Sequence, residues 1–154
     1  MATKSAVTVR PVTAADEPRW RELYAAYRDF YKLEPSDAVL DRVWGWLLDP
    51  AHPTSGLVAS VDGVIQGIAH HRFFFSPYVG TKNVFLDDLF TDPASRGQGV
   101  GRALIGALTD LAGTEGCDIV QWETADNNHT AQALYDSLAS RTTWVTYEAQ
   151  ATRP

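Results

Sequence analysis

The stretch Arg96-Gly97-Gln98-Gly99-Val100-Gly101 is the most informative part of this sequence. Its glycines allow backbone N–H groups to approach an anion closely, and a helix N-terminus directly after them would add a partial positive charge. The stretch therefore indicates a phosphate-binding loop between a strand and a helix. A glycine-rich loop can also simply connect a strand to a helix, and the loop alone leaves that alternative open.

Two nucleotide-binding motifs with similar glycines do not fit this loop. A Walker loop requires Gly-Lys-Ser/Thr after its second glycine, whereas Gly101 is followed by Arg102-Ala103. A dinucleotide fingerprint, G-x-G-x-x-G, requires a glycine at position 102 and a place near the N-terminal strand of a βαβ unit. Neither motif is present, so the rest of the chain must decide what the loop binds.

The segments around the loop alternate between strand and helix patterns. Before it, residues 83–91 are β-prone but contain Asp87-Asp88, which predicts a central strand with a polar insertion. After it, apolar residues at helical spacing predict a helix that ends near Gly113 and Gly116. The remaining predicted elements are a strand over 119–124, a helix over 128–138 and a final strand over 142–148.

The N-terminal part of the chain predicts a strand over 7–10 followed by two helices. Thr13 and Asp16 form a capping-box pattern before the first helix. Ser36 is a favourable N-cap for the second helix, which ends at the Asp49-Pro50 step. The aromatic residues that recur in these helices, and that we expect mostly in the core, are Trp20, Tyr24, Tyr27, Tyr31 and Trp44.

Strands over 57–61 and 64–75 flank Asp62-Gly63, a pair typical of a type I′ hairpin. The predicted order is therefore β α α β β β α β α β, without a linker or an internal repeat. This order favours a single mixed α/β domain over residues 1–154.

The composition excludes several classes of protein. The chain has 13 Lys+Arg and 19 Asp+Glu, a formal net charge of −6, which argues against a nucleic-acid partner. No apolar run approaches the roughly 20 residues that span a bilayer, and the first ten residues lack a secretory signal pattern, so we expect a cytoplasmic protein without a membrane partner. The single cysteine, Cys117, and four scattered histidines offer no zinc-ligand spacing, so no metal is expected.

Two motifs together resemble those of the GNAT superfamily of N-acetyltransferases. Residues 96–101 are similar to its Arg/Gln-x-x-Gly-x-Gly/Ala loop and follow Leu89-Phe90-Thr91-Asp92-Pro93 at the usual offset, and residues 128–135 are similar to its Asn-x-x-Ala-x-x-Leu-Tyr motif. Residues 85–90 and the closing Trp144-x-x-Tyr147 most resemble the small polyamine- or histone-type members. The resemblance implies a mixed α+β fold whose central, mostly antiparallel sheet is splayed in the middle and flanked by helices.

The resemblance also implies acetyl-CoA as co-substrate. The glycine loop and its two arginines would hold the pyrophosphate, residues 89–91 would bind the pantetheine through their backbone, and Asn128 would contact it from the other side. The residues expected to bind acetyl-CoA are Leu89, Phe90, Thr91, Arg96, Gly97, Gln98, Gly99, Val100, Gly101, Arg102, Asn128 and Ala131.

The expected catalytic residues are Asp87, Asp88 and Tyr135. The nucleophile is the substrate amine, so a carboxylate would capture its ammonium form and Tyr135 would protonate the departing thiolate. Simple alternation along a strand places Asp87 and Asp88 on opposite faces, so only one would face the acetyl group unless a bulge intervenes. The polyamine-type members have Glu-Asp at this point, and the resemblance to the family favours Asp87.

These residues favour an acetyl-CoA-dependent N-acetyltransferase acting on a primary amine of a small molecule, of polyamine, diamine or amino-acid type. A protein or peptide lysine acetyltransferase is the second hypothesis, and a non-catalytic acyl-CoA sensor is the third. In this fold the first two helices border the acceptor site, so part of the aromatic set could line it. The resemblance further implies a homodimer.

Overall fold

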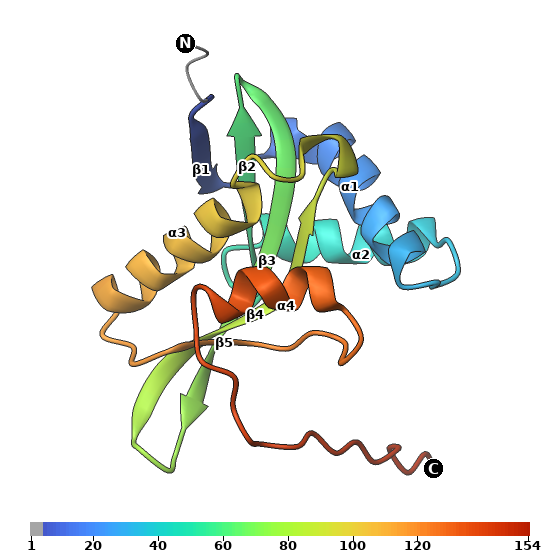
Figure 1. The fold of residues 1–154 in the computed structure, drawn as a ribbon. Helices are drawn as coiled ribbons and strands as arrows, with labels where there is room; N and C mark the ends of the chain where they lie inside the picture. The colour runs from blue at the N-terminus through green and yellow to red at the C-terminus, as the bar shows by residue number, and fades with distance from the viewer. Residues whose placement is uncertain (1–4) are drawn as a thin grey trace. The chain divides into compact units, whose positions relative to one another are not determined.

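The computed structural model describes residues 5–154. They belong to two compact units, Met1–Glu123 and Thr124–Pro154, which are described separately. The first unit contains β1 (Val7–Pro11), η1 (Ala14–Asp16), α1 (Glu17–Phe30), α2 (Asp37–Leu48), β2 (Ser55–Val61), β3 (Val64–Ser76), β4 (Thr81–Thr91), η2 (Pro93–Ser95), α3 (Val100–Thr114) and β5 (Val120–Trp122), and the second contains α4 (His129–Asp136) (Figure 1).

The first unit is built on a five-stranded sheet in the order β1-β2-β3-β4-β5. Neighbouring strands are antiparallel except for β4 and β5, which are parallel. The β2–β3 turn has positive φ at both central residues, 51° at Asp62 and 80° at Gly63, as a type I′ hairpin requires. The mixed α+β fold and its mostly antiparallel sheet are therefore confirmed.

The local signals for the first two helices are satisfied as the sequence predicts. The Asp16 carboxylate accepts a hydrogen bond from the Thr13 backbone N–H at 2.8 Å. The Ser36 hydroxyl oxygen accepts one from the Val39 backbone N–H at 3.2 Å and begins α2. A short polar side chain thus satisfies a backbone N–H at the start of η1, which leads directly into α1, and at the start of α2.

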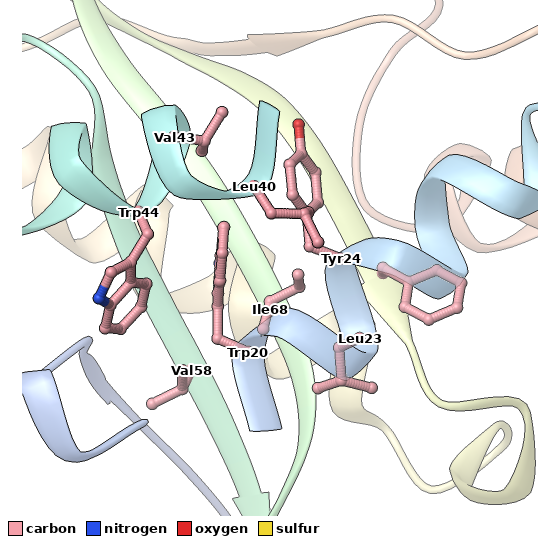
Figure 2. Close-up of a cluster of buried hydrophobic side chains, with 9 residues drawn as sticks. Trp20, Leu23, Tyr24, Leu40, Val43, Trp44, Val58 and Ile68 are labelled. Atoms are coloured by element: carbon pink, nitrogen blue, oxygen red, sulfur yellow. The ribbon is translucent and has the colours of Figure 1, made fainter. Parts of the chain in front are cut away.

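Helices α1 and α2 cover one face of the sheet with a buried apolar cluster. Trp20 lies at its centre, 5.0 Å from Trp44 and 5.2 Å from Tyr24 between ring centroids (Figure 2). The buried members are Trp20, Leu23, Tyr24, Leu40, Val43, Trp44, Val58, Ile68 and Phe90. The expectation that most of the aromatic set belongs to the core is confirmed for Trp20, Tyr24 and Trp44, whereas Tyr31 is exposed.

Helix α3 packs on the opposite face of the sheet, where a glycine allows close approach. A Cβ atom at Gly67 of β3 would lie 2.4 Å from Cγ1 of Val100, the first residue of α3. Real side chains do not tolerate that distance, so Gly67 lets the start of α3 lie directly on the sheet.

The predicted final strand over 142–148 is wrong, because residues 124–154, all of which the structure describes, contain α4 and no strand. Trp144 and Tyr147 are 85% and 90% exposed. A strand requires a hydrogen-bonded neighbour, and aromatic and β-branched residues alone do not provide one. The neighbouring predictions are shortened at their ends: residues 119–124 give β5, and residues 128–138 give α4.

In the described part of the chain, none of the helices is both long enough and apolar enough to span a membrane.

Candidate functional site

The glycine loop leads into α3 with its backbone in the left-handed region. Gly97 and Gly99 have φ of 80° and 84°, and a Cβ at either position would meet open space. The conformation, not crowding, therefore requires glycine here. Gly99 is the N-cap of α3 and has no side chain to cap the helix, and a helix N-terminus of this kind favours an anion.

A polar network joins the start of this loop to α1 and β3. The Asp92 carboxylate accepts hydrogen bonds from Arg19 at 2.8 Å and from the Ala94 N–H at 2.9 Å, and the Asp92 N–H donates to the Gln66 carbonyl at 2.8 Å. The Arg19 hydrogen bond lowers the pKa of Asp92, so the ion pair persists at neutral pH. Sequence analysis missed Arg19, since nothing in its local pattern indicates a partner 73 positions away.

A β-bulge places both aspartates of β4 on the same side of the sheet. His70 pairs with Asp88 and His71 with Leu86, so Asp87 has no partner on β3. Asp88 contacts His70 at 2.8 Å, and Asp87 accepts a hydrogen bond from Arg72 Nε at 3.2 Å. His70 and Arg72 are two positions apart and share a face. Simple alternation therefore fails at this point, and the bulge alternative is correct.

Asp88 is held in a cage of hydrogen-bond donors. Its Oδ1 accepts from the Tyr27 hydroxyl at 2.8 Å, and its Oδ2 accepts from the Tyr24 hydroxyl at 3.1 Å and from His70. Burial raises the pKa of Asp88, but the hydrogen bonds from His70, Tyr27 and Tyr24 outweigh burial, so the net pKa lies below its ordinary value. Burial and the Asp88 charge raise the pKa of both phenols, which keep their protons.

The hydrogen bonds of His70 determine its tautomer. Trp20 Nε1–H, which can only donate, lies 2.9 Å from His70 Nε2, so this nitrogen accepts. The ring proton is therefore on Nδ1 and is donated to Asp88. The imidazole is neutral and 2% exposed, so Asp88 keeps its negative charge without a cationic partner in this cage.

Asp87 has a different environment from its neighbour. Its Oδ1 accepts from Arg72, whereas its Oδ2 has no hydrogen-bond partner among residues 5–154. Burial raises the pKa of Asp87, and Arg72 opposes this effect. The carboxylate is 33% exposed, so one of its oxygens is available to a ligand while Asp88 has donors on both.

The aspartates lie where β4 separates from β5. The parallel ladder between these strands covers Val84–Leu86 and Val120–Trp122, so β4 continues for five residues without pairing on that side. Leu89, Phe90 and Thr91 belong to this segment, which pairs only with β3. The Phe90 side chain is 7% exposed and lies in the core, so its backbone is the part that could contact a ligand.

The remaining predicted site residues lie in three other places. Arg96 and Gln98 are exposed in the glycine loop, and Arg102 is exposed in the first turn of α3. In the second unit, the Asn128 side chain accepts a hydrogen bond from the Ala131 N–H at 3.3 Å and caps α4, and Tyr135 is half-buried near the end of that helix. The ligand contacts assigned to Asn128 and Ala131 stay predictions.

Sequence analysis also missed the donors around the aspartates. Tyr24 and Tyr27 are three positions apart on one helix face, a spacing that indicates a common direction but not a common partner. The adjacent His70 and His71 were considered only as metal ligands. The signal that could have found His70 is its place opposite the polar insertion once the hairpin register is known.

The sequence is similar to a known protein family and to individual proteins. A sequence model of the acetyltransferase (GNAT) family matches residues 20–139. D-amino-acid N-acetyltransferase HPA3 of Saccharomyces cerevisiae is 29% identical over 144 residues, covering 92% of this chain and 89% of that protein. Thialysine N-epsilon-acetyltransferase of Sus scrofa is 32% identical over 75 residues, covering 49% of this chain and 44% of that protein.

The fold is also similar to solved structures. Aminoglycoside N-acetyltransferase AAC(6')-Iy in complex with CoA superposes with a TM-score of 0.79 and 22% sequence identity, covering 99% of each chain. The similarity extends over the sheet and its flanking helices.

Proposed function

This chain belongs to the GNAT family of N-acetyltransferases, enzymes that use acetyl-CoA, and we propose that its acceptor is a primary amine of a small molecule. The observation that carries this proposal is the partly open Asp87 carboxylate beside the ionised Asp88. With Arg72 as the paired cation and His70 neutral, these groups leave one excess negative charge, which favours an ammonium group.

Asp87 is the better candidate for capturing the acceptor. An ammonium of pKa about 10.4 is neutral in roughly one molecule in a few thousand at pH 7, which costs on the order of 4 to 5 kcal/mol. An ordinary carboxyl is a weak base for such a proton, and Asp88 has a lowered pKa and both oxygens engaged. Asp87 therefore orients the ammonium, and Asp88 keeps Tyr24 and Tyr27 in place beside it.

The names of the relatives support an acceptor of this size. HPA3 is named for D-amino acids, the Sus scrofa enzyme for thialysine, and AAC(6')-Iy for aminoglycosides. All three names denote small molecules with amino groups. Extended to this chain, they favour a small amine over a lysine within a protein.

For acetyl-CoA we propose a path along the glycine loop and β4. The N-terminus of α3 suits the pyrophosphate, with Arg96 and Arg102 as nearby positive charges. The β4 edge that faces away from β3 at Leu89, Phe90 and Thr91 suits the pantetheine and the thioester carbonyl. The family match crosses from the first compact unit into the second, which supports one functional domain over residues 1–154.

A thiol-release assay with a panel of amines tests the acceptor. We expect higher kcat/KM for polyamines, diamines or amino acids than for histone-tail peptides. Asp87→Asn should lower kcat/KM for cationic acceptors by about tenfold or more, and by less for neutral amines, because a charge-assisted hydrogen bond is lost. Asp110→Asn, at an exposed position of α3, is the matched control.

Two outcomes would contradict this proposal. A peptide that outperforms every small amine, with Asp87→Asn slowing both classes alike, would favour a protein lysine acetyltransferase. Acetyl-CoA binding without turnover of any amine would favour a sensor.

We propose Tyr135 as the general acid for the departing thiolate, a role worth typically 10²- to 10⁴-fold in rate. Tyr135→Phe keeps the ring and removes the proton. Turnover should fall while the affinity for acetyl-CoA, measured by titration, stays near that of the wild type. Unchanged kcat across the pH range would assign the proton transfer to water.

A further inference from the structure

Arg72 is positioned to bind a carboxylate. Its guanidinium carbon lies 4.6 Å from the centroid of the Phe85 ring, and Phe74 packs edge-on against that ring at 6.1 Å. Only Nε of Arg72 is engaged, by Asp87, and neither terminal nitrogen has a partner in residues 5–154. The side chain is 41% exposed. A stacked guanidinium with its two terminal nitrogens free matches the two oxygens of a carboxylate.

The same ion pair also offers a free acceptor for a cation. Asp87 Oδ2 is unpartnered within the described residues, and the bond that joins Asp87 to Arg72 is a single contact of 3.2 Å. A free carboxylate oxygen and a free guanidinium edge therefore lie side by side. The Asp87 carboxylate is negative and the adjacent Arg72 guanidinium is positive. This pair of charges is complementary to an ammonium and a carboxylate that are bonded to the same carbon atom.

We propose that the acceptor is a free α-amino acid, whose carboxylate binds Arg72 and whose α-ammonium binds Asp87. This inference rests on the proposed function and names its substrate class. A polyamine has no carboxylate and would bring a second positive charge against Arg72. A lysine side chain within a peptide lacks an adjacent carboxylate as well, so Arg72 selects against both.

The transfer balances as follows. The α-ammonium loses one proton to solvent, the free amine forms a bond to the thioester carbonyl carbon, and the C–S bond breaks. The nitrogen loses a second proton as the amide forms and the sulfur takes up one, so an amino acid and acetyl-CoA give an N-acetyl amino acid, CoA thiol and one released proton. The product has lost its ammonium and keeps a negative charge beside Asp87 and Asp88, which favours its release.

The test compares acceptors that differ only at the carboxyl group. Alanine, phenylalanine and lysine, each in D and L form, are assayed beside their carboxamides, and the ratio of kcat/KM for acid over amide defines the carboxylate preference. The ratio is compared between enzyme variants, so the different amine pKa values of acid and amide cancel.

Arg72→Gln should reduce the carboxylate preference by about 10- to 100-fold, the factor expected for a lost charge-assisted bidentate contact. Arg72→Lys keeps the positive charge but loses the paired N–H donors of the guanidinium group, so it should retain part of the preference for the carboxylate. Arg42→Gln, at an exposed position of α2, should leave the ratio at its wild-type value. Thermal unfolding with acetyl-CoA verifies that each variant is folded and binds the co-substrate.

Different results would disprove the α-amino acid assignment and the proposed function. Equal losses for acid and amide in Arg72→Gln, or a polyamine preferred over every amino acid, would overturn the α-amino acid assignment while leaving a small-amine acetyltransferase. If Arg72→Gln does not fold, an unreduced preference in Arg72→Lys overturns the assignment in the same way. Absence of turnover with every amine would overturn the proposed function itself.

Discussion

His71 has the most unfavourable surroundings of the polar side chains in the sheet. It is 5% exposed, and its Nδ1 has no hydrogen-bond partner in the part of the chain that the structure describes. Burial lowers the pKa of His71 to about 4. The adjacent His70 has hydrogen-bond partners on both ring nitrogens, so the two consecutive histidines differ in how well their polar atoms are satisfied.

His71 should therefore make stability depend on pH. Between pH 6.5 and about 4 the unfolded chain binds a proton at this position and the folded chain does not, so the free energy of unfolding falls as the pH falls. The loss should reach about 3 kcal/mol, because a tenfold change in proton affinity corresponds to about 1.4 kcal/mol. Denaturant titrations of wild type and His71→Leu at pH 7.5 and 4.5 measure it, and the variant should lose most of this dependence.

The matched control is the exposed His129→Gln, which should keep the wild-type dependence on pH. The same acid sensitivity in His71→Leu and wild type would assign the effect to other groups.

At the scale of elements, small irregularities determine how the strands and helices present the site. The bulge at Asp87 brings two carboxylates to one face. The register of β2 and β3 also shifts between Ala59 and Ser60, opposite Gln66. The Gln66 side chain accepts a hydrogen bond from Arg19. Both irregularities are in ladders formed by β3. The start of α3 is in turn set by its contact with Gly67 of this strand.

Gly67→Ala should move the N-terminus of α3 away from the sheet. The added Cβ would also lie 3.2 Å from Leu104 Cδ1 and from the Phe90 carbonyl oxygen. A movement of the new methyl group away from Val100 is therefore restricted by these two atoms. We expect a loss of about 1 to 3 kcal/mol in stability, as for other overpacked sites, and weaker acetyl-CoA binding. Thermal unfolding with and without acetyl-CoA measures both effects.

Gly106→Ala is the matched control, since a Cβ at this position of α3 meets no atom within 4 Å. It should be neutral or stabilising by up to about 1 kcal/mol because alanine favours a helix. If the Gly67→Ala protein had wild-type stability and the same increase in Tm on adding acetyl-CoA, the start of α3 would tolerate displacement.

At the scale of the whole molecule, the C-terminal segment exposes apolar surface. Trp144, Val145 and Tyr147 are 85%, 73% and 90% exposed, in a stretch whose composition is typical of a strand. Exposed aromatic and β-branched residues in an extended segment favour pairing with another chain. This surface could serve the homodimer expected from the sequence resemblance.

We predict that the protein is a dimer in solution and that this segment contributes to the interface. Light scattering after size-exclusion chromatography should give twice the monomer mass for the wild type. Trp144→Glu with Tyr147→Glu should shift it toward the monomer, because two charges cannot be buried without partners. A monomeric wild type, or a variant as dimeric as the wild type, would contradict the prediction.

The sequence by itself determined the features that depend on near neighbours. Ser36 and Val39 are three positions apart, and Asp62 and Gly63 are adjacent, so a cap and a turn were predictable from residue types alone. The glycine loop and the 128–135 motif are equally local, and they were sufficient to indicate the family and the mixed α+β sheet.

Only the tertiary structure decided which groups the aspartates contact and whether the last strand forms. Asp88 is 64 and 61 positions from Tyr24 and Tyr27, and Trp20 is 50 positions from His70. Contacts this distant depend on the register of β3 and β4 and on where α1 packs, because a shift of one residue turns every side chain to the other face. The charge of Asp88, the open oxygen of Asp87 and the free edge of Arg72 all follow from that register. Strand propensity over 142–148 is not enough by itself, because no strand forms there in the described residues 5–154.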